Sequence, residues 1–174
     1  MTFAARHSRR AFTLMELLAV VVILGLTSAI VLPQIGDHDD SMVTSAAREL
    51  TADLLYAQSC AIATGRMHYV VFDAGHGKYA VMDAIDPPHV VINPAQQAPL
   101  EVVIGKAPLQ GVWASRIDFD GQTALAFDAV GTPYACTAGE QHLSPLNAGS
   151  IVLTSGAATR TISVQPMSGE IKVQ

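Results

Sequence analysis

One carboxylate is notable for its place in the sequence. Glu16 stands at the head of an apolar run, residues 17–36, that contains no charged residue. A carboxylate at the end of an apolar helix is costly to bury unless a cation or a hydrogen-bond donor accompanies it. We therefore expect Glu16 to have a charged partner, and the chemistry it offers is charge pairing.

The other potential ligands lack the spacing of a metal or catalytic site. Residues 37–40, Asp-His-Asp-Asp, are adjacent in sequence, and adjacent side chains rarely converge on one ion. Residues 118–121 resemble the start of a calcium loop but lack its later glutamate. There is no nucleophile elbow, phosphate-binding glycine loop or HExxH motif. We expect no catalytic residue, no cofactor and no bound metal, and hence no enzyme.

The two cysteines, Cys60 and Cys136, leave two alternatives open. A disulfide between them can form if the domain faces an oxidising compartment. The other alternative is a pair of buried thiols that act as small apolar groups. The sequence gives no distance between the two residues, so it does not decide between them.

The uncharged run has the length of a membrane span, since its 20 residues as a helix cover about 30 Å. Arg6, Arg9 and Arg10 precede it, whereas residues 37–174 hold 14 acidic and 7 basic side chains, a net charge of −7. Basic residues stay on the cytoplasmic side, so we expect a single pass through the inner membrane with a periplasmic domain. An acidic domain is a poor partner for nucleic acid.

Two helical patterns come first along the chain. The apolar one begins at Phe12 and should kink or end at Pro33. The second runs from about Ser41, a candidate N-cap, to residue 64, with Gly65 as its stop signal. Its apolar residues recur at three- and four-residue steps and form one stripe. The stripe consists of Ala46, Leu50, Leu54, Ala57 and Ala61.

Strand patterns follow from residue 67. Residues 67–73 and 78–83 are rich in β-branched and aromatic side chains and are joined by a glycine-containing turn typical of a hairpin. Further strands are expected at 100–104, 112–119, 123–128, 150–154, 160–165 and 170–173. The predicted fold class is α+β: a long N-terminal helix packed by its amphipathic half on an antiparallel sheet.

Residues 9–18, RRAFTLMELL, resemble the type III signal of type IV pilins and type II secretion pseudopilins. The resemblance implies a pilin-like fold, cleavage by a prepilin peptidase between Ala11 and Phe12, and N-methylation of Phe12. It also implies that Glu16 pairs with the new Phe12 amine of a neighbouring subunit during filament assembly. Ala11 departs from the glycine that the family usually has there. The implied organisation is a leader at 1–11, a transmembrane helix at 12–36, an amphipathic helix at 37–65 and a β-rich domain at 66–174.

Three later segments narrow the resemblance. Residues 46–65, 127–131 and 168–173 are similar to the type II secretion minor pseudopilin H group and to related T- and U-type minor pilins. The resemblance implies a structural subunit of the periplasmic pseudopilus, active in filament initiation or at the tip and assembled with other pseudopilins or pilins. The alternative is a minor pilin of a type IV pilus. Some relatives bind DNA through a basic turn, but Glu170 stands where that turn needs an arginine.

A further alternative rests on residues 8–14, which also resemble a twin-arginine export signal. The chain would then be an exported soluble protein, cut near residues 27–29. An acid within the hydrophobic segment and the length of that segment both speak against this interpretation.

Overall fold

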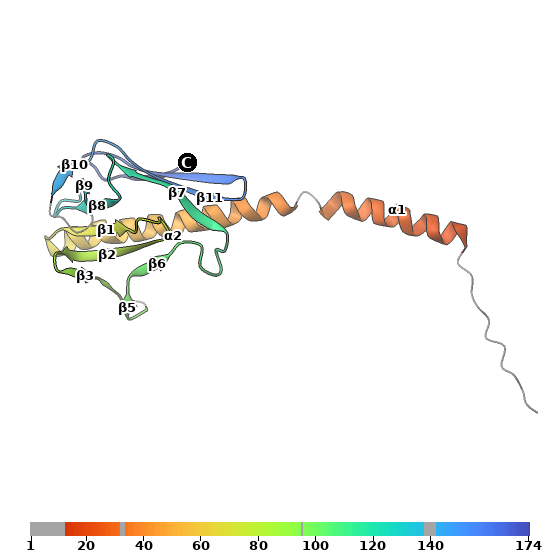
Figure 1. Cartoon of the computed structure of the whole chain (residues 1–174), viewed down its shortest axis with the longest axis horizontal. Coiled ribbons are helices and arrows are strands. Elements are labelled where there is room, and N and C mark those ends of the chain that lie inside the picture. The colour runs from red at the N-terminus through yellow and green to blue at the C-terminus, as the bar shows by residue number, and fades with distance from the viewer. Residues whose placement is uncertain (1–12, 32–33, 95, 138–141) are drawn as a thin grey trace, which may run out of the picture. The chain divides into compact units, whose positions relative to one another are not determined.

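The structure, a computed structural model, describes residues 13–31, 34–94, 96–137 and 142–174. These residues fall into two compact units, Met1–Asp37 and His38–Gln174. The expected leader, the cut between Ala11 and Phe12 and the kink at Pro33 lie outside the described residues. Figure 1 gives the element labels used below.

The first unit contains helix α1 (Leu14–Val31), which is built almost entirely of apolar residues with Glu16 in its first turn. Residues 13–27 all have exposed side chains. A helix that is apolar on every side is one whose surface favours apolar surroundings. Over the described residues, no helix combines the length and the mean hydropathy that a membrane span requires.

Helix α2 (Gln34–Thr64) enters the globular unit at His38. The predicted stripe is confirmed, because Leu54, Ala57 and Ala61 are fully buried and the other two members nearly so. Gly65 ends the helix as predicted: its φ is +67°, a left-handed conformation that glycine adopts without strain, and its N–H donates to the carbonyl of Ala61.

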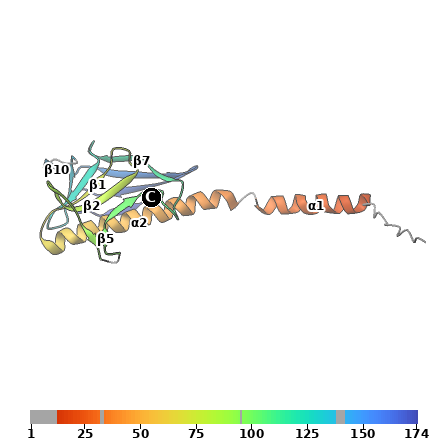
Figure 2. The ribbon, with the colours of Figure 1, turned by 60° about the horizontal axis from the view of Figure 1, so that its bottom comes forward.

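The strands form two main antiparallel sheets (Figures 1 and 2). The first has the order β10-β9-β8-β1-β2-β3, with β6 also paired to β2; the second has the order β13-β12-β11-β7; β4 and β5 pair separately. The bounds are β1 His68–Phe72, β2 Lys78–Ile85, β3 Pro88–Val90, β4 Ile92–Asn93, β5 Ala98–Pro99, β6 Glu101–Val103, β7 Val112–Phe119, β8 Ala124–Phe127, β9 Pro133–Cys136, β10 Leu143–Pro145, β11 Gly149–Ser155, β12 Ala158–Val164 and β13 Ile171–Val173.

One hydrophobic core joins α2 to both sheets. The buried stripe of α2 shares a cluster with Val70 and Phe127 of the first sheet and with Ile151 and Ile162 of the second. Figure 2 shows α2 along one side of the globular unit with the strands over it. A smaller cluster, Ala124, Ala126 and Cys136, lies on the other face of the first sheet, since these residues alternate with core residues along β8 and β9.

The prediction that Ser41 caps the second helix is wrong. The helix begins at Gln34, and Ser41 lies inside it, where its carbonyl accepts a hydrogen bond from the Ser45 hydroxyl. Residues 36–40 are therefore helical as well. The carboxylates of Asp39 and Asp40 have partners on the hairpin of β11 and β12, and these tertiary contacts outweigh the local capping preference.

The predicted strands are present, and the described residues contain five further short strands that were not predicted. Among these, β9 lies between β8 and β10 in the first sheet. Residues 131–133, Gly-Thr-Pro, indicate a turn, yet Pro133 is the first residue of β9, where a strand tolerates a missing N–H donor. Here the turn residues mark the entry to a strand.

Candidate assembly site

The first turn of α1 is capped by a residue of the signal motif. The backbone N–H of Glu16 donates to the hydroxyl oxygen of Thr13 at 3.2 Å and to the Thr13 carbonyl at 3.1 Å. Thr13 is thus the N-cap and Glu16 is the third helical residue, the spacing of a capping box. The pattern Thr-x-x-Glu at residues 13–16 is the sequence signal for this role.

The carboxylate of Glu16 is exposed on the first turn of α1. Acidic side chains are common at this end of a helix, the positive end of the helix dipole. Among the residues that the structure describes, no basic side chain forms an ion pair with it. The expected partner, the amine of a cleaved Phe12, falls outside the described residues, so the pairing stays a prediction.

Where α2 enters the globular unit, two acidic residues bind the hairpin of β11 and β12. Arg160 donates to Asp40 at 2.6 Å, and the Ser155 hydroxyl donates to Asp39 at 3.4 Å. Gly156, at the hairpin tip, lies so close to Asp39 that a Cβ there would clash with its carboxylate. Residues 37–40, considered above as a metal site, thus include side chains that hold the helix to the second sheet.

At the other end of the globular unit, the segments 127–131 and 168–173, which the sequence analysis named, both contact the side chain of Gln58. The amide nitrogen of Gln58 donates to the carbonyls of Gly131 at 2.9 Å and Gly169 at 3.4 Å. A Cβ on Gly169 would lie 2.6 Å from the Gly131 carbonyl oxygen. This close approach depends on the lack of a side chain at Gly169. Both glycines also have positive φ, a conformation that glycine adopts without strain.

A partly buried hydrogen bond links α2 to the first sheet. The hydroxyl of Tyr79 on β2 donates to the carboxylate of Asp53 at 2.6 Å. Burial raises the pKa of Asp53, and the hydrogen bond from Tyr79 opposes that rise. Burial, together with the negative charge of Asp53, raises the pKa of Tyr79, so the phenol remains a neutral donor. This pair is a structural contact of the fold.

Both cysteines are free thiols in the structure. Cys60 is half-buried on α2, whereas Cys136 packs in the small cluster on the face of the first sheet that is turned away from the main core. Burial raises the pKa of Cys136 to about 11. The disulfide between Cys60 and Cys136 stays one of the two alternatives that the sequence left open.

The sequence of secondary elements, a long helix and then antiparallel sheets packed on its second half, is that of pilin-like subunits. The structure is similar to the type IV minor pilin FimU of Pseudomonas aeruginosa, with a TM-score of 0.50 and 20% identity over 76% of this chain and 87% of that one. It is also similar to the minor pseudopilin EpsH from the type 2 secretion system of Vibrio cholerae, with a TM-score of 0.52 and 10% identity over 76% and 95%. A comparison with curated proteins gives no match.

The sequence models of two families identify the chain further. The type II transport protein GspH family matches residues 46–169, and the prokaryotic N-terminal methylation motif matches residues 6–32. The chain belongs to the GspH family, a family of structural subunits of type II secretion that assemble with other pilin-like subunits. The predicted pilin-like fold and the predicted pseudopilin class are confirmed.

Proposed function

We propose that the chain is a minor pseudopilin that initiates, or lies near the tip of, the periplasmic pseudopilus of a type II secretion system. The observation that carries this proposal is the presence of both sequence-model matches on one chain. A methylation motif covers its start, and the GspH family covers most of its globular unit.

In this proposal a prepilin peptidase in the inner membrane cuts between Ala11 and Phe12, and the new amino group of Phe12 is methylated. The leader remains in the cytoplasm, the apolar helix crosses the membrane once, and the globular unit lies in the periplasm. Alanine is small, as is the glycine usual before the cut, so the precursor still fits the peptidase. Because alanine differs from that usual glycine, cleavage is slower.

Cleavage also creates the charged partner that Glu16 needs. In a filament, the Phe12 amine of one subunit can meet the Glu16 carboxylate of its neighbour inside an apolar core. There the attraction between the two charges is much stronger than in water, and an unpaired charge is strongly disfavoured. This favours one axial register over others, because any other offset leaves both charges unpaired. The Thr13 cap supports the pairing by holding Glu16 in the first turn of the helix.

Intact-mass analysis and N-terminal sequencing of the mature protein test the proposal, in cells with and without the prepilin peptidase gene. We expect an N-methylated Phe12 only when the peptidase is present, and loss of secretion when the gene for this chain is deleted. A mature start near Ile30 would support the exported soluble protein instead. Normal secretion together with a loss of surface pili would support a type IV minor pilin.

A further inference from the structure

The second sheet has a solvent-facing side that is rich in hydroxyl groups. Along β11, buried residues alternate with half-buried ones, so every second side chain points away from the core. The strand register places the outward residues of β12 beside them: Thr159 lies opposite Thr154, and Ser163 lies opposite Ser150. We call this side of the sheet the hydroxyl face, and it consists of Trp113, Ser150, Thr154, Thr159, Thr161 and Ser163.

Trp113 supplies the large apolar surface of the hydroxyl face. It is 48% exposed and lies on β7, the edge strand of the sheet, opposite Thr154. An indole ring has flat apolar faces, and these are available for stacking when the ring is exposed. Among the outward residues that the structure describes on β7, β11 and β12, only Val152 is also apolar, and it is half-buried. The hydroxyl face therefore lacks the apolar centre that is typical of a protein interface.

A β-bulge shapes the surroundings of Trp113. The register of β7 and β11 shifts after Val152, so Ser115 is an extra residue on β7, and its side chain is exposed. The hydroxyl of Thr154 donates to the hydroxyl oxygen of Ser115 at 3.1 Å, and the Ser115 hydroxyl donates to the Val152 carbonyl at 3.2 Å. These bonds hold the polar groups beside the indole ring in fixed positions.

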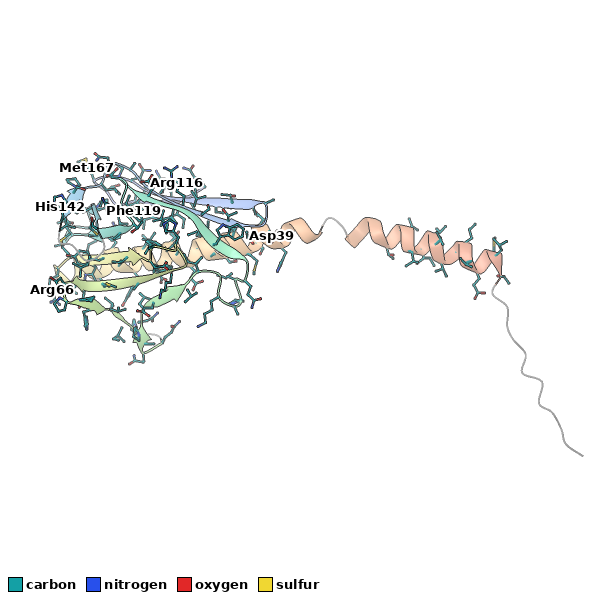
Figure 3. The ribbon with its side chains drawn as sticks, viewed as in Figure 1. Asp39, Arg66, Arg116, Phe119, His142 and Met167 are labelled. Atoms are coloured by element: carbon teal, nitrogen blue, oxygen red, sulfur yellow. The ribbon has the colours of Figure 1, made fainter. Side chains whose placement is uncertain are left out.

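The charged residues next to the hydroxyl face are paired with one another. Arg116, labelled in Figure 3, donates to Asp118 at 2.7 Å, and the Lys172 ammonium lies 3.1 Å from the Glu170 carboxylate. The two pairs cancel, so they add no net charge to this side of the sheet, although residues 37–174 have a net charge of −7. A strongly charged partner therefore gains little attraction at this face.

Several hydroxyl groups of the face are available to a ligand. In the part of the chain that the structure describes, those of Ser150, Thr159 and Thr161 make no hydrogen bond to another residue. Each hydroxyl can both donate and accept a hydrogen bond. Thr159 and Thr161 are two residues apart on β12, so their side chains lie about 7 Å from each other along the strand. The face thus offers an array of donors and acceptors beside one aromatic ring.

We propose that the hydroxyl face binds the uncharged glycan strands of the cell wall. The C–H groups on one side of a sugar ring stack on an indole ring, while its hydroxyl and amide groups exchange hydrogen bonds with serine and threonine side chains. A ligand of this chemistry needs neither a charged site nor a broad apolar one, which matches the residues present. The inference rests on the proposed function, because that function puts the globular unit in the periplasm, where the cell-wall glycan lies.

The fluorescence of Trp113 tests the inference in the full-length protein in detergent, because Trp113 is the only tryptophan of the chain. The probe is a soluble oligomer of N-acetylglucosamine. We expect a saturable change in the emission of Trp113 that added salt does not weaken, since no charge attraction is involved. No change in emission, or a change that salt abolishes, would overturn the inference.

Co-sedimentation of the same protein with purified cell-wall sacculi gives a second readout. W113A removes the stacking surface and should lower the sedimented fraction about tenfold, as at a binding hot spot. T159V/T161V keeps the shape of the strand but removes two free hydroxyls, so it should also lower that fraction. The matched control is I92A on β4, a residue that is 51% exposed and lies outside the hydroxyl face. All these side chains are exposed or half-buried, so the melting temperatures should stay close to that of the wild type.

Removal of the peptide stems from the sacculi separates the glycan from the other component of the wall. Binding should persist after this treatment, because the sugar chains remain. Loss of binding with the peptides, wild-type binding in W113A and T159V/T161V, or an equal loss in I92A would each contradict the inference. A mature chain that begins at Phe12 and supports secretion, yet does not bind the glycan, would refute this site and leave the proposed function intact.

Discussion

The hydroxyl oxygen of Thr13 lies 3.2 Å from the backbone nitrogen of Glu16 and accepts its hydrogen bond. The residue proposed to pair charges during assembly is therefore anchored by the residue three positions before it. In the signal motif these two positions are a threonine and a glutamate, the residue types of a capping box. The motif thus has a role in folding, because it caps the first turn of α1.

This relationship predicts a graded effect at position 13. T13A removes the cap and should destabilise the first turn of α1 by about 1 kcal/mol, which speeds hydrogen exchange of the Glu16 and Leu17 amides, both bonded to Thr13, by about fivefold. T13S keeps the hydroxyl and should behave as the wild type. Exchange in detergent-solubilised full-length protein is the measurement. Equal exchange in T13A and the wild type would refute the role of the cap.

Glu16 should matter for assembly but not for processing. E16Q removes the charge, while the backbone N–H still donates to Thr13. A desolvated charge that loses its partner costs about 3–5 kcal/mol, so filament recovery should fall by about two orders of magnitude or more. The mass of the mature chain should still correspond to cleavage after Ala11. E49Q, at an exposed glutamate of α2, is the matched control. Normal assembly in E16Q would exclude the charge-pairing account.

The sequence predicted those elements whose determinants are local. The stripe of α2 repeats with the helical period, and the strand at 112–119 coincides with β7 because its apolar residues suit a half-buried pleated surface. The start of α2 could not be predicted in the same way. The contact of Asp40 with Arg160 spans 120 residues, and nothing in the local sequence around Ser41 signals it.

The residues of the candidate assembly site differ in the same way: some have local sequence signals, and others depend on contacts between residues far apart in the chain. Glu16 was identified from its position beside an uncharged run, and Thr13 could have been found from its spacing to Glu16. The contact of Gln58 with the two glycine turns could not be predicted, because the carbonyls that it binds are 73 and 111 residues away in sequence. The sequence marked the two glycine segments separately, and only the fold brings them together.

Two adjacent leucines of α2 provide a direct test of the core. Leu54 is fully buried, whereas Leu55 is 45% exposed. L54A should lower the free energy of unfolding by about 3 kcal/mol, because it removes buried apolar surface and leaves a cavity. L55A should lower it by less than about 1 kcal/mol. Urea unfolding of both variants measures the difference, and similar losses would show that the stripe is assigned wrongly.

The two thiols should react at very different rates. Only the thiolate is nucleophilic, and burial raises the pKa of Cys136 to about 11, so its reaction at pH 8 is slow. We expect a thiol reagent to label Cys60 in the native protein and Cys136 only after unfolding, with no labelling of native C60S. A reductant should leave the melting temperature unchanged. Two unreactive cysteines and a lower melting temperature under reduction would instead indicate a disulfide.

The Asp53–Tyr79 pair predicts an unusual dependence of stability on pH. Because burial raises the pKa of Asp53 above its ordinary value, the folded state binds this proton more tightly than the unfolded state does. The contribution of Asp53 to stability is therefore greatest below its unfolded pKa, near 3.9, and decreases as pH rises towards the folded value.

D53N should remove that loss while its side-chain oxygen still accepts the hydrogen bond from Tyr79. The variant should unfold with a free energy up to about 1 kcal/mol higher than the wild type at pH 7, a modest gain because the carboxyl group is partly solvated. The difference should shrink at pH 3.5, where Asp53 is largely protonated. Y79F, in contrast, leaves Asp53 without its donor and should cost about 1–3 kcal/mol at pH 7. Urea unfolding at both pH values measures these changes; a D53N variant that is less stable than the wild type at pH 7 would show that the carboxylate stabilises the fold.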